Sequence, residues 1–484
     1  MSFHSTQTAS TSTTSKPGTF SKEKNQNMKL PDGPKIPAFL QLLKWVGEPF
    51  EYLEDCSKRY GDIFTLRLFG FPPLVVIGNP QGIEEIFSAD AESFDAGRTN
   101  EYFRPYFGEN CLLLIDGDHH KRKRKLIMPP FHGEKVKSYA ESICQIAERI
   151  TSQWQVNKPF IAMDAMKDMA LETILQILFG LNEGECYQQI KSLLTQGLDT
   201  IYSWQSGLFY FKFLQKDWGE WSPWGKYIRY NQQIHALFQD EIESRRANPQ
   251  RQGNDFLSLM LSTSDEDGQP MTDEELRDEI IALLIAGHES TTVALTWALY
   301  WVNKLPEVKE RLVQEIDSLG KNPDPITISR LPYLTAVCQE ALRIYPVFPI
   351  TFKRITNSTA EIMGRKFEPG TVMLPSIYLT HHREDLYPEP KQFLPERFLE
   401  RKYSAFEFLP FGGGNRICPG FALVMLEMKL TLATILSSYQ LELADDKLVK
   451  IQSRGVSVYP SNGVPLVVTG KRDRKLLPQY YTMT

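Results

Sequence analysis

The feature that most constrains this chain is a glycine-rich loop that leads into a cysteine, Phe411-Gly-Gly-Gly-Asn-Arg-Ile-Cys-Pro-Gly420. Glycine adopts positive φ without strain, so such a loop can bring its backbone close to a flat cofactor. An apolar, helix-forming run begins directly after it at Phe421. Cys418 is therefore expected just before a helix, where unpaired N–H groups and the positive end of the helix dipole favour the thiolate, the form that binds iron.

The remaining cysteines show no CxxC spacing, which favours free thiols in a reducing cytosol over disulfides or a zinc site. A free cysteine is most often a small buried hydrophobic residue. That is our interpretation of the other five, Cys56, Cys111, Cys144, Cys186 and Cys338.

Composition narrows the class of protein. The chain has 484 residues, 42% of them apolar, and a net charge of −5, so nothing global indicates binding to nucleic acid. The first residues are rich in Ser, Thr, Lys and Gln and lack the apolar core of a signal peptide. The longest apolar stretch, Ile280–Tyr300, is interrupted by polar residues at 287–292, which predicts a buried helix rather than a transmembrane anchor. We expect a soluble, cytoplasmic protein.

The pattern along the chain predicts one mixed domain. Short strand-like runs stand at Ile63–Leu68 and Pro73–Ile77 and return at Thr371–Leu374 and Leu466–Val468. Between about 118 and 343, apolar residues recur at helical spacing. No repeat or linker divides the chain, so we expect a disordered tail over 1–29, a single domain over 30–470, and a C-terminal tail over 471–484. The predicted fold class is mainly α with small β-sheets (α+β).

The cysteine loop matches a known signature. Its residues Phe411, Gly414, Arg416, Cys418 and Gly420 fit the haem-binding motif F-x-x-G-x-R-x-C-x-G, so the chain resembles the cytochrome P450 family. The resemblance implies the cytochrome P450 fold, a helix-rich domain that encloses haem b (iron protoporphyrin IX), with Cys418 as the axial ligand of the iron. It also implies an O2-dependent monooxygenase.

Two further motifs follow the family's order. Glu340-Ala-Leu-Arg343 fits its E-x-x-R helix, in which i,i+3 spacing puts the two charges on one face. Pro395-Glu-Arg-Phe398 fits the segment whose arginine, here Arg397, joins that pair. The resemblance implies a buried charge network on the cysteine side of the haem.

Ala286-Gly-His-Glu-Ser-Thr291 resembles the helix that crosses the other face of the haem. Glycine and hydroxyls in mid-helix cost stability, which suggests a function there. The resemblance assigns Glu289, Ser290 and Thr291 to catalysis, as a relay of protons toward the cofactor. The family usually has Thr where this chain has Ser290, which predicts looser coupling of electrons to product. We interpret His288 as helix packing.

The basic run Asp118–Lys125 contains a pair that resembles the family's propionate-binding pair, so His120 and Arg124 are assigned to a haem propionate, with Arg354 and Arg416 at its other positions. The neighbouring Lys121, Arg122, Lys123 and Lys125 are expected to point outward and to steer an acidic partner. Because no reductase is fused, we expect electrons from a ferredoxin or flavodoxin with its reductase.

The substrate pocket is placed by analogy, and nearly all its residues are apolar. They are Cys111, Leu112, Leu113, Ala282, Ile285, Ala286, Val347, Phe348, Ile350 and Val456. The aromatic stretch Ile201–Phe213 falls where the family has a mobile lid. We expect a small hydrophobic substrate such as a fatty acid, a terpene or an alkane, and a monomeric protein. Two alternatives stay open, namely a peroxygenase or isomerase of the same fold and a non-catalytic haem sensor.

Overall fold

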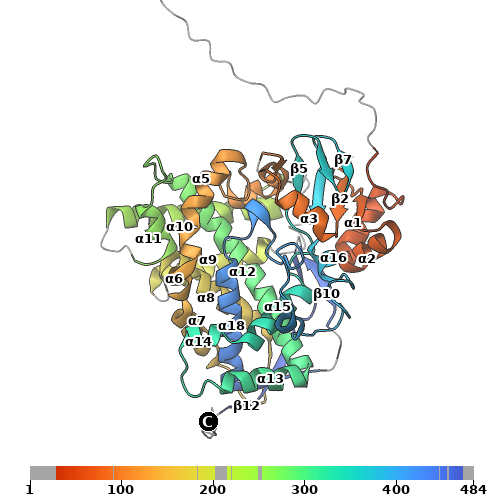
Figure 1. Cartoon of the computed structure of the whole chain (residues 1–484). Helices are drawn as coiled ribbons and strands as arrows, with labels where there is room; N and C mark the ends of the chain where they lie inside the picture. The colour runs from red at the N-terminus through yellow and green to blue at the C-terminus, as the bar shows by residue number, and fades with distance from the viewer. Residues whose placement is uncertain are drawn as a thin grey trace, which may run out of the picture.

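The computed structural model describes residues 29–472, apart from residues 91, 182–183, 202–214, 220, 249–252, 446, 448 and 455–456. Helices make up most of the body, and small sheets gather with the first helices on one side of it (Figure 1). The chain from 29 to 37 is not helical, as its closely spaced prolines predict, and the first helix begins at Ala38.

Eleven helices among the described residues have ten residues or more. They are α1 (Ala38–Gly47), α2 (Pro49–Tyr60), α5 (Gly117–Ile127), α7 (Ala140–Thr151), α8 (Ala162–Phe179), α9 (Glu185–Ile201), α10 (Pro223–Ala247), α12 (Asp273–Lys304), α13 (Pro306–Asp317), α15 (Pro332–Ile344) and α18 (Phe421–Ser438). The shorter helices and 3₁₀ turns connect them. They are α3 (Pro80–Phe87), η1 (Gly97–Phe103), α4 (Arg104–Phe107), η2 (Pro129–Phe131), α6 (Gly133–Lys137), α11 (Phe256–Ser262), α14 (Pro325–Ser329), α16 (Ile377–His381), α17 (Arg397–Glu400) and η6 (Gly414–Arg416).

The largest sheet in the described part of the chain joins strands that are far apart in sequence. Its order is β1 (Ile63–Leu66), β2 (Leu74–Ile77), β8 (Val372–Pro375), β5 (Arg354–Thr356) and β3 (Phe94–Asp95). A second sheet has the order β4 (Pro159–Ile161), β12 (Pro465–Lys471) and β9 (Tyr439–Leu443). Two hairpins complete the set, β6 (Ala360–Ile362) with β7 (Arg365–Phe367), and β10 (Ile451–Arg454) with β11 (Ser457–Pro460).

The strand predictions near residues 63, 73, 371 and 466 are confirmed, and so is the helical stretch between 118 and 343. The parallel pairing of β2 with β8, with Leu74 opposite Val372, joins an early and a late segment of the chain in one sheet. Strand β12 ends at Lys471, one residue beyond the expected boundary at 470. The boundaries of the two tails stay predictions.

Helix α12 runs through the centre of the molecule beside α18 (Figure 1). It begins with a capping box in which the Thr272 side chain and Glu275 satisfy each other's backbone N–H groups. Helices α12 and α18 are long and apolar enough to cross a membrane by length and composition alone, but 61% and 67% of their most apolar windows are buried in the protein. The expectation that Ile280–Tyr300 is a buried helix fits this burial.

Candidate active site

The cysteine loop folds back on itself just before α18. The Cys418 backbone N–H donates to the Phe411 carbonyl at 2.9 Å, and Gly412 and Gly414 have φ of 69° and 64°. These two glycines therefore supply the left-handed conformations that the sequence predicted for this loop. Cys418 stands at the end of this tight turn and is half-buried as a whole residue.

Glycine is also required here for close packing. A Cβ atom at Gly413 would lie 2.4 Å from the Phe87 ring, and one at Gly414 would lie 2.6 Å from the Phe87 carbonyl oxygen. Helix α3, which ends at Phe87, therefore supports the outer side of the loop. No local pattern predicted this contact, because the two segments are more than three hundred residues apart.

The Cys418 thiol is more desolvated than the sequence suggested. Burial raises its pKa, while the Gly420 N–H and the nearby Arg124 guanidinium lower it without reversing the shift. The Gly420 N–H therefore acts in the direction expected of a position before α18, and the thiolate form of Cys418 stays a prediction. A bound metal cation would favour the thiolate directly.

Four basic residues converge at this loop, one from the loop itself and three from two distant segments. Arg124 donates to the Ile417 carbonyl at 2.8 Å, and Arg416 donates to the Leu112 carbonyl at 3.1 Å and pairs with Asp116. Arg354 is buried, and the hydrogen bonds that the structure gives it go to the Phe352 and Lys353 carbonyls. His120 is buried, and its Nε2 atom has no hydrogen-bond partner among the described residues.

These basic groups are close enough to shift one another's pKa values. Burial, followed by repulsion from Arg416 and Arg124, lowers the pKa of His120 to about 3. Burial and then Arg416 lower the pKa of Arg354 to about 9. Among the described residues, Asp116 is the one carboxylate that forms an ion pair with the group. Uncompensated buried cations are unfavourable, so the cluster is suited to bind carboxylates, and haem carries two propionates.

The Glu340 network is assembled from the two charged motifs of the sequence. Arg343 donates to both Glu340 oxygens at 2.6 and 2.8 Å, and Arg397 donates to Oε1 at 3.2 Å. The Leu394 N–H donates to the same oxygen at 2.9 Å. Glu340 and Arg343 are completely buried. The structure thus brings together the three residues that the two sequence motifs supplied.

Helix α12 presents a strip of small residues that the core does not cover. Ala282 and Ser290 are partly exposed and Ala286 is exposed, at i, i+4 and i+8 of a mostly buried helix. The Ser290 hydroxyl donates to the Ala286 carbonyl at 2.7 Å, the i−4 bond expected for a mid-helix hydroxyl. Glu289 accepts a hydrogen bond of 2.7 Å from the Ser457 hydroxyl of β11.

The two other polar residues of this segment lie away from the strip. Thr291 is 1% exposed, so its assignment to catalysis finds no support in its placement. His288 is buried as well, which agrees with its interpretation as a packing residue.

The expected pocket residues divide into two groups. Leu113, Phe348 and Ile350 are partly exposed, as are the small residues of the α12 strip. The others are buried, and they are Cys111, Leu112, Ile285 and Val347. Val456 and the expected lid at 202–213 lie outside the described residues.

Two buried members of the pocket set have clear environments. Ile285 lines a small apolar cavity between α9, α10 and α12. Cys111 packs in the main core, and burial together with Glu279 raises its pKa to about 12.

The expected outward basic face is wrong for Lys123. Its side chain is 0% exposed, its ammonium lies 3.7 Å from the buried Glu279 carboxylate, and it donates to the Asn110 carbonyl. Arg122 is bound to Asp265 and Glu275. Helix α5 packs this face against the start of α12, so two of the four basic residues hold the fold together.

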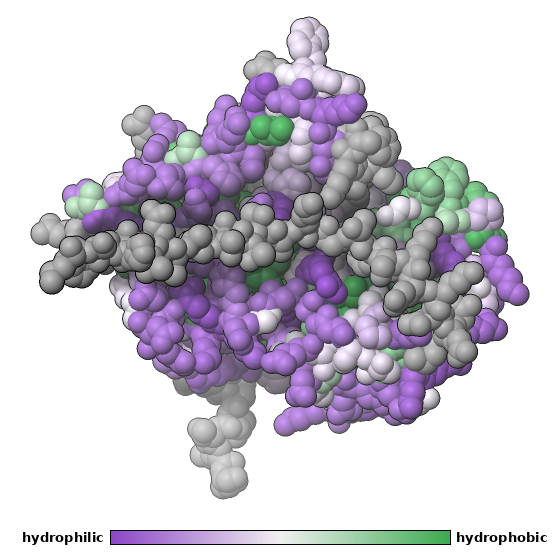
Figure 2. Space-filling view, turned by 90° about the horizontal axis from the view of Figure 1, so that it is seen from above, coloured by the Kyte–Doolittle hydropathy of each residue, from purple (hydrophilic) through white to green (hydrophobic). Residues whose placement is uncertain are grey.

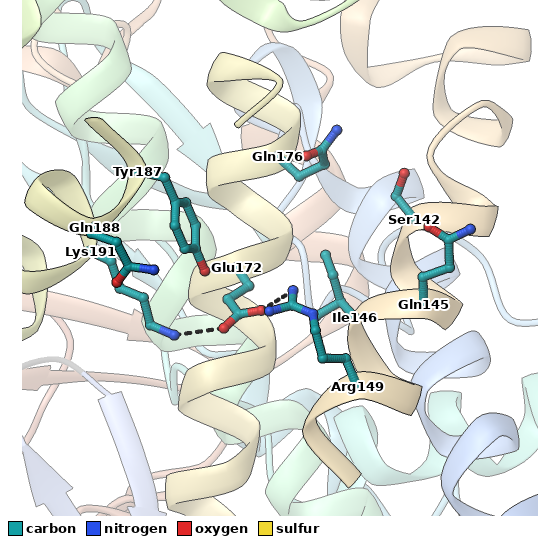
Figure 3. A pocket seen from close by; sticks show the side chains of 9 residues that line it. All are labelled: Ser142, Gln145, Ile146, Arg149, Glu172, Gln176, Tyr187, Gln188 and Lys191. Atoms are coloured by element: carbon teal, nitrogen blue, oxygen red, sulfur yellow. Dashed lines mark hydrogen bonds and ion pairs between the residues drawn. The ribbon is translucent and has the colours of Figure 1, made fainter. Parts of the chain in front are cut away.

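A separate cavity of about 400 Å³ lies between α7, α8 and α9 and shares no residue with the cysteine loop (Figure 3). At its centre Glu172 is paired with Arg149 and, at 2.6 Å, with Lys191. Two cations flank this one carboxylate, but the cavity shares no residue with the cysteine loop, so we assign it no role in the chemistry. Among the described residues, no group of three or more His, Cys, Asp or Glu side chains could hold a metal ion, so a cysteine-ligated cofactor remains the one metal site indicated.

Comparison with known proteins identifies the family. The family model for Cytochrome P450 matches residues 31–466. The chain belongs to the cytochrome P450 family. A putative cytochrome P450 135B1 of Mycobacterium tuberculosis is 32% identical over 448 residues, 92% of this chain and 93% of the relative. The putative cytochrome P450 135A1 of the same species is 31% identical and covers 93% of this chain and 96% of its own length.

The fold prediction is confirmed by solved structures. A retinoic acid-bound cyanobacterial CYP120A1 superposes with a TM-score of 0.79 at 24% identity, covering 92% of this chain and all of that one. Membership of the cytochrome P450 family makes this protein an enzyme of a haem monooxygenase family, which uses O2, a substrate and a redox partner. The cation cluster and the cysteine loop fit the haem that the family binds.

Two residues of this cytochrome P450 site had no signal in the sequence. Asp116 accepts hydrogen bonds from the backbone N–H groups of residues 96, 97 and 98 at 2.8 to 2.9 Å and pairs with Arg416. Ser457 reaches Glu289 from a strand 168 residues away. Only tertiary structure brings these partners together.

Proposed function

We propose that this cytochrome P450 binds haem b through Cys418 and inserts one atom of O2 into a hydrophobic substrate. The observation that carries the proposal is the convergence of His120, Arg124, Arg354 and Arg416 around the cysteine loop with one paired carboxylate. Those four residues would hold the two propionates, and Cys418 would hold the iron. Haem bound there supplies the redox chemistry that activates O2.

The residues of α12 would deliver protons. The Ser290 hydroxyl gives its hydrogen to the Ala286 carbonyl, so its lone pairs can accept a hydrogen bond from water on the open strip. Glu289, held by Ser457, stands next to it in the chain and is suited to exchange protons with such water. An acid and a hydroxyl at this place favour O2 use over a peroxygenase or isomerase, which needs no such relay.

The substrate would lie between the α12 strip and the segment around Phe348 and Ile350. These residues are apolar or small, so they exclude water and bind by hydrophobic contact. We propose a fatty acid, a terpene or an alkane, which undergoes hydroxylation or epoxidation. A non-catalytic haem sensor would leave the Glu289–Ser457 contact beside the strip without a role.

The electron donor would be a ferredoxin or flavodoxin with its reductase. On α5, Lys121 and Lys125 are exposed, and their ion pairs with Asp118 and Glu266 lie at the surface, where an acidic partner could compete for them. The cytoplasmic location, the monomeric state and the single domain over 30–470 remain predictions of the sequence.

The test is a binding screen of the haem-loaded protein with fatty acids, terpenes and alkanes, followed by product analysis with a surrogate ferredoxin system. A ligand that shifts the haem from low to high spin and then acquires one oxygen atom supports the proposal. Product formation that requires hydrogen peroxide and does not occur with O2 and reductant would favour a peroxygenase.

A further inference from the structure

Lys353 is a cation in apolar surroundings. Its ammonium lies 4.6 Å from the centre of the Tyr102 ring and 5.3 Å from the centre of the Phe71 ring. Burial, the one cause at work, lowers its pKa to about 8, so no charged neighbour offsets its desolvation. Among the described residues no carboxylate forms an ion pair with it. Glu101, which precedes Tyr102 in the chain, pairs with Arg104 at 3.9 Å.

The backbone around this lysine is held in place. The Lys353 carbonyl accepts from the Thr99 hydroxyl at 3.2 Å and from Arg354 at 3.4 Å. Arg354 points to the cation cluster beside the cysteine loop, because its pKa responds to Arg416 and Asp116. Lys353 is thus one residue from the expected propionate site, yet its ammonium lies among the rings of Phe71 and Tyr102.

The surroundings of Lys353 form an aromatic wall. Phe103 packs on Tyr102 with ring centres 4.3 Å apart and on Phe107 at 5.5 Å. Phe352, which is 39% exposed, meets the edge of Phe103 at 6.2 Å. Three residues before Lys353 in the chain is Ile350, one of the partly exposed residues of the expected substrate pocket.

An apolar surface adjoins this wall. The Phe69 N–H donates to the Ala38 carbonyl at the start of α1, so the turn that carries Phe69 and Phe71 rests against that helix. Phe69 and much of one face of α1 are exposed, including Phe39, Leu43 and Val46. Figure 2 shows hydrophobic side chains gathered on this side of the molecule.

We propose that Lys353 binds the carboxylate of the substrate, and that the substrate is therefore an apolar acid rather than a neutral hydrocarbon. This rests on the proposed function. A single ammonium suits a monoanion, and the aromatic wall suits the hydrophobic body attached to it. A partly desolvated cation that has ring partners but no paired carboxylate gains most from a charged hydrogen bond that a ligand supplies.

The experiment compares dodecanoic acid with dodecanol, which share one chain and differ in charge. Binding to the haem-loaded protein is followed by the spin-state change. A charge-assisted hydrogen bond in this setting predicts about tenfold tighter binding of the acid. In Lys353→Gln the acid and the alcohol should bind about equally, whereas Lys353→Arg should keep the preference for the acid. Lys44→Gln is the matched control, because Lys44 also lies over a ring, that of Tyr52, but is exposed.

A second readout needs no turnover. Acetic anhydride should modify the Lys353 amine of the haem-loaded protein, and dodecanoic acid should protect it whereas dodecanol should not. Equal binding of acid and alcohol by the unchanged protein, or an acid preference that survives in Lys353→Gln, would overturn the inference. If only neutral ligands are oxidised, the inference fails while the proposed function stands. If no ligand is oxidised although haem is bound through thiolate, the proposed function fails.

Discussion

The buried pair of Lys123 and Glu279 predicts a large and specific loss of stability. The two side chains are 0% and 2% exposed and 3.7 Å apart, and Glu279 also accepts from the Leu112 N–H at 2.9 Å. Removing one partner of a buried pair leaves an uncompensated charge, at a cost of about 3–5 kcal/mol. Glu279→Gln leaves the buried Lys123 ammonium without its carboxylate, so the free energy of unfolding should fall by this amount. Lys123→Met should lie near its lower end, because Glu279 can then take up a proton.

The pH dependence of the Lys123→Met variant has a definite sign. Burial already raises the pKa of Glu279 and Lys123 lowers it, so removing Lys123 raises it further. The folded variant then binds a proton that the unfolded chain releases above the ordinary glutamate pKa. Stability is therefore retained below that pKa and falls as the pH rises toward the folded-state value.

Urea unfolding followed by tryptophan fluorescence measures these losses. The control is Lys125→Met, two residues along the same helix, where an exposed pair with Glu266 predicts a loss below about 1 kcal/mol. The double variant Lys123→Met/Glu279→Gln should be more stable than either single variant. Losses below about 1 kcal/mol in both single variants, or strictly additive losses in the double variant, would refute the reasoning.

Three further predictions concern other parts of the site and the core. Glu340→Ala should cost about 3–5 kcal/mol, because it strands Arg343 and Arg397, and haem content after purification should fall with it. Burial raises the pKa of Glu427 to about 8, so folding favours its protonated form. The free energy of unfolding should therefore fall as the pH rises from the ordinary glutamate pKa to about 8. Urea titrations of Glu427→Gln should show a flatter dependence on pH. Ser290→Thr should raise, and Ser290→Ala should lower, the yield of product per electron consumed, measured against hydrogen peroxide release.

Local motifs predicted the parts of this molecule that depend on short stretches of chain. The Cys418 loop, the helix after it and the i,i+3 pair of Glu340 and Arg343 are all set by residues close in sequence. The alternation of helices and short strands was predictable for the same reason. The family's motif order then placed Arg397 and Arg354 where the structure has them.

The sequence failed where partners come from distant segments. Lys123 stands in a run of basic residues typical of a solvated face, yet α12 supplies Glu279 and buries it. Asp116 and Ser457 belong to no motif, and their partners are 300 and 168 residues away. The burial that raises the pKa of the Cys418 thiol has the same origin, because distant segments of the fold supply it.

The central claim is that Cys418 holds the haem iron as a thiolate. The most direct test is the absorption spectrum of the purified, reduced protein with bound CO. We predict the red-shifted Soret band of a thiolate-ligated haem in the unchanged protein and its loss in Cys418→Ser. A band of the kind that histidine-ligated haem gives, or a thiolate band that persists in Cys418→Ser, would contradict the account.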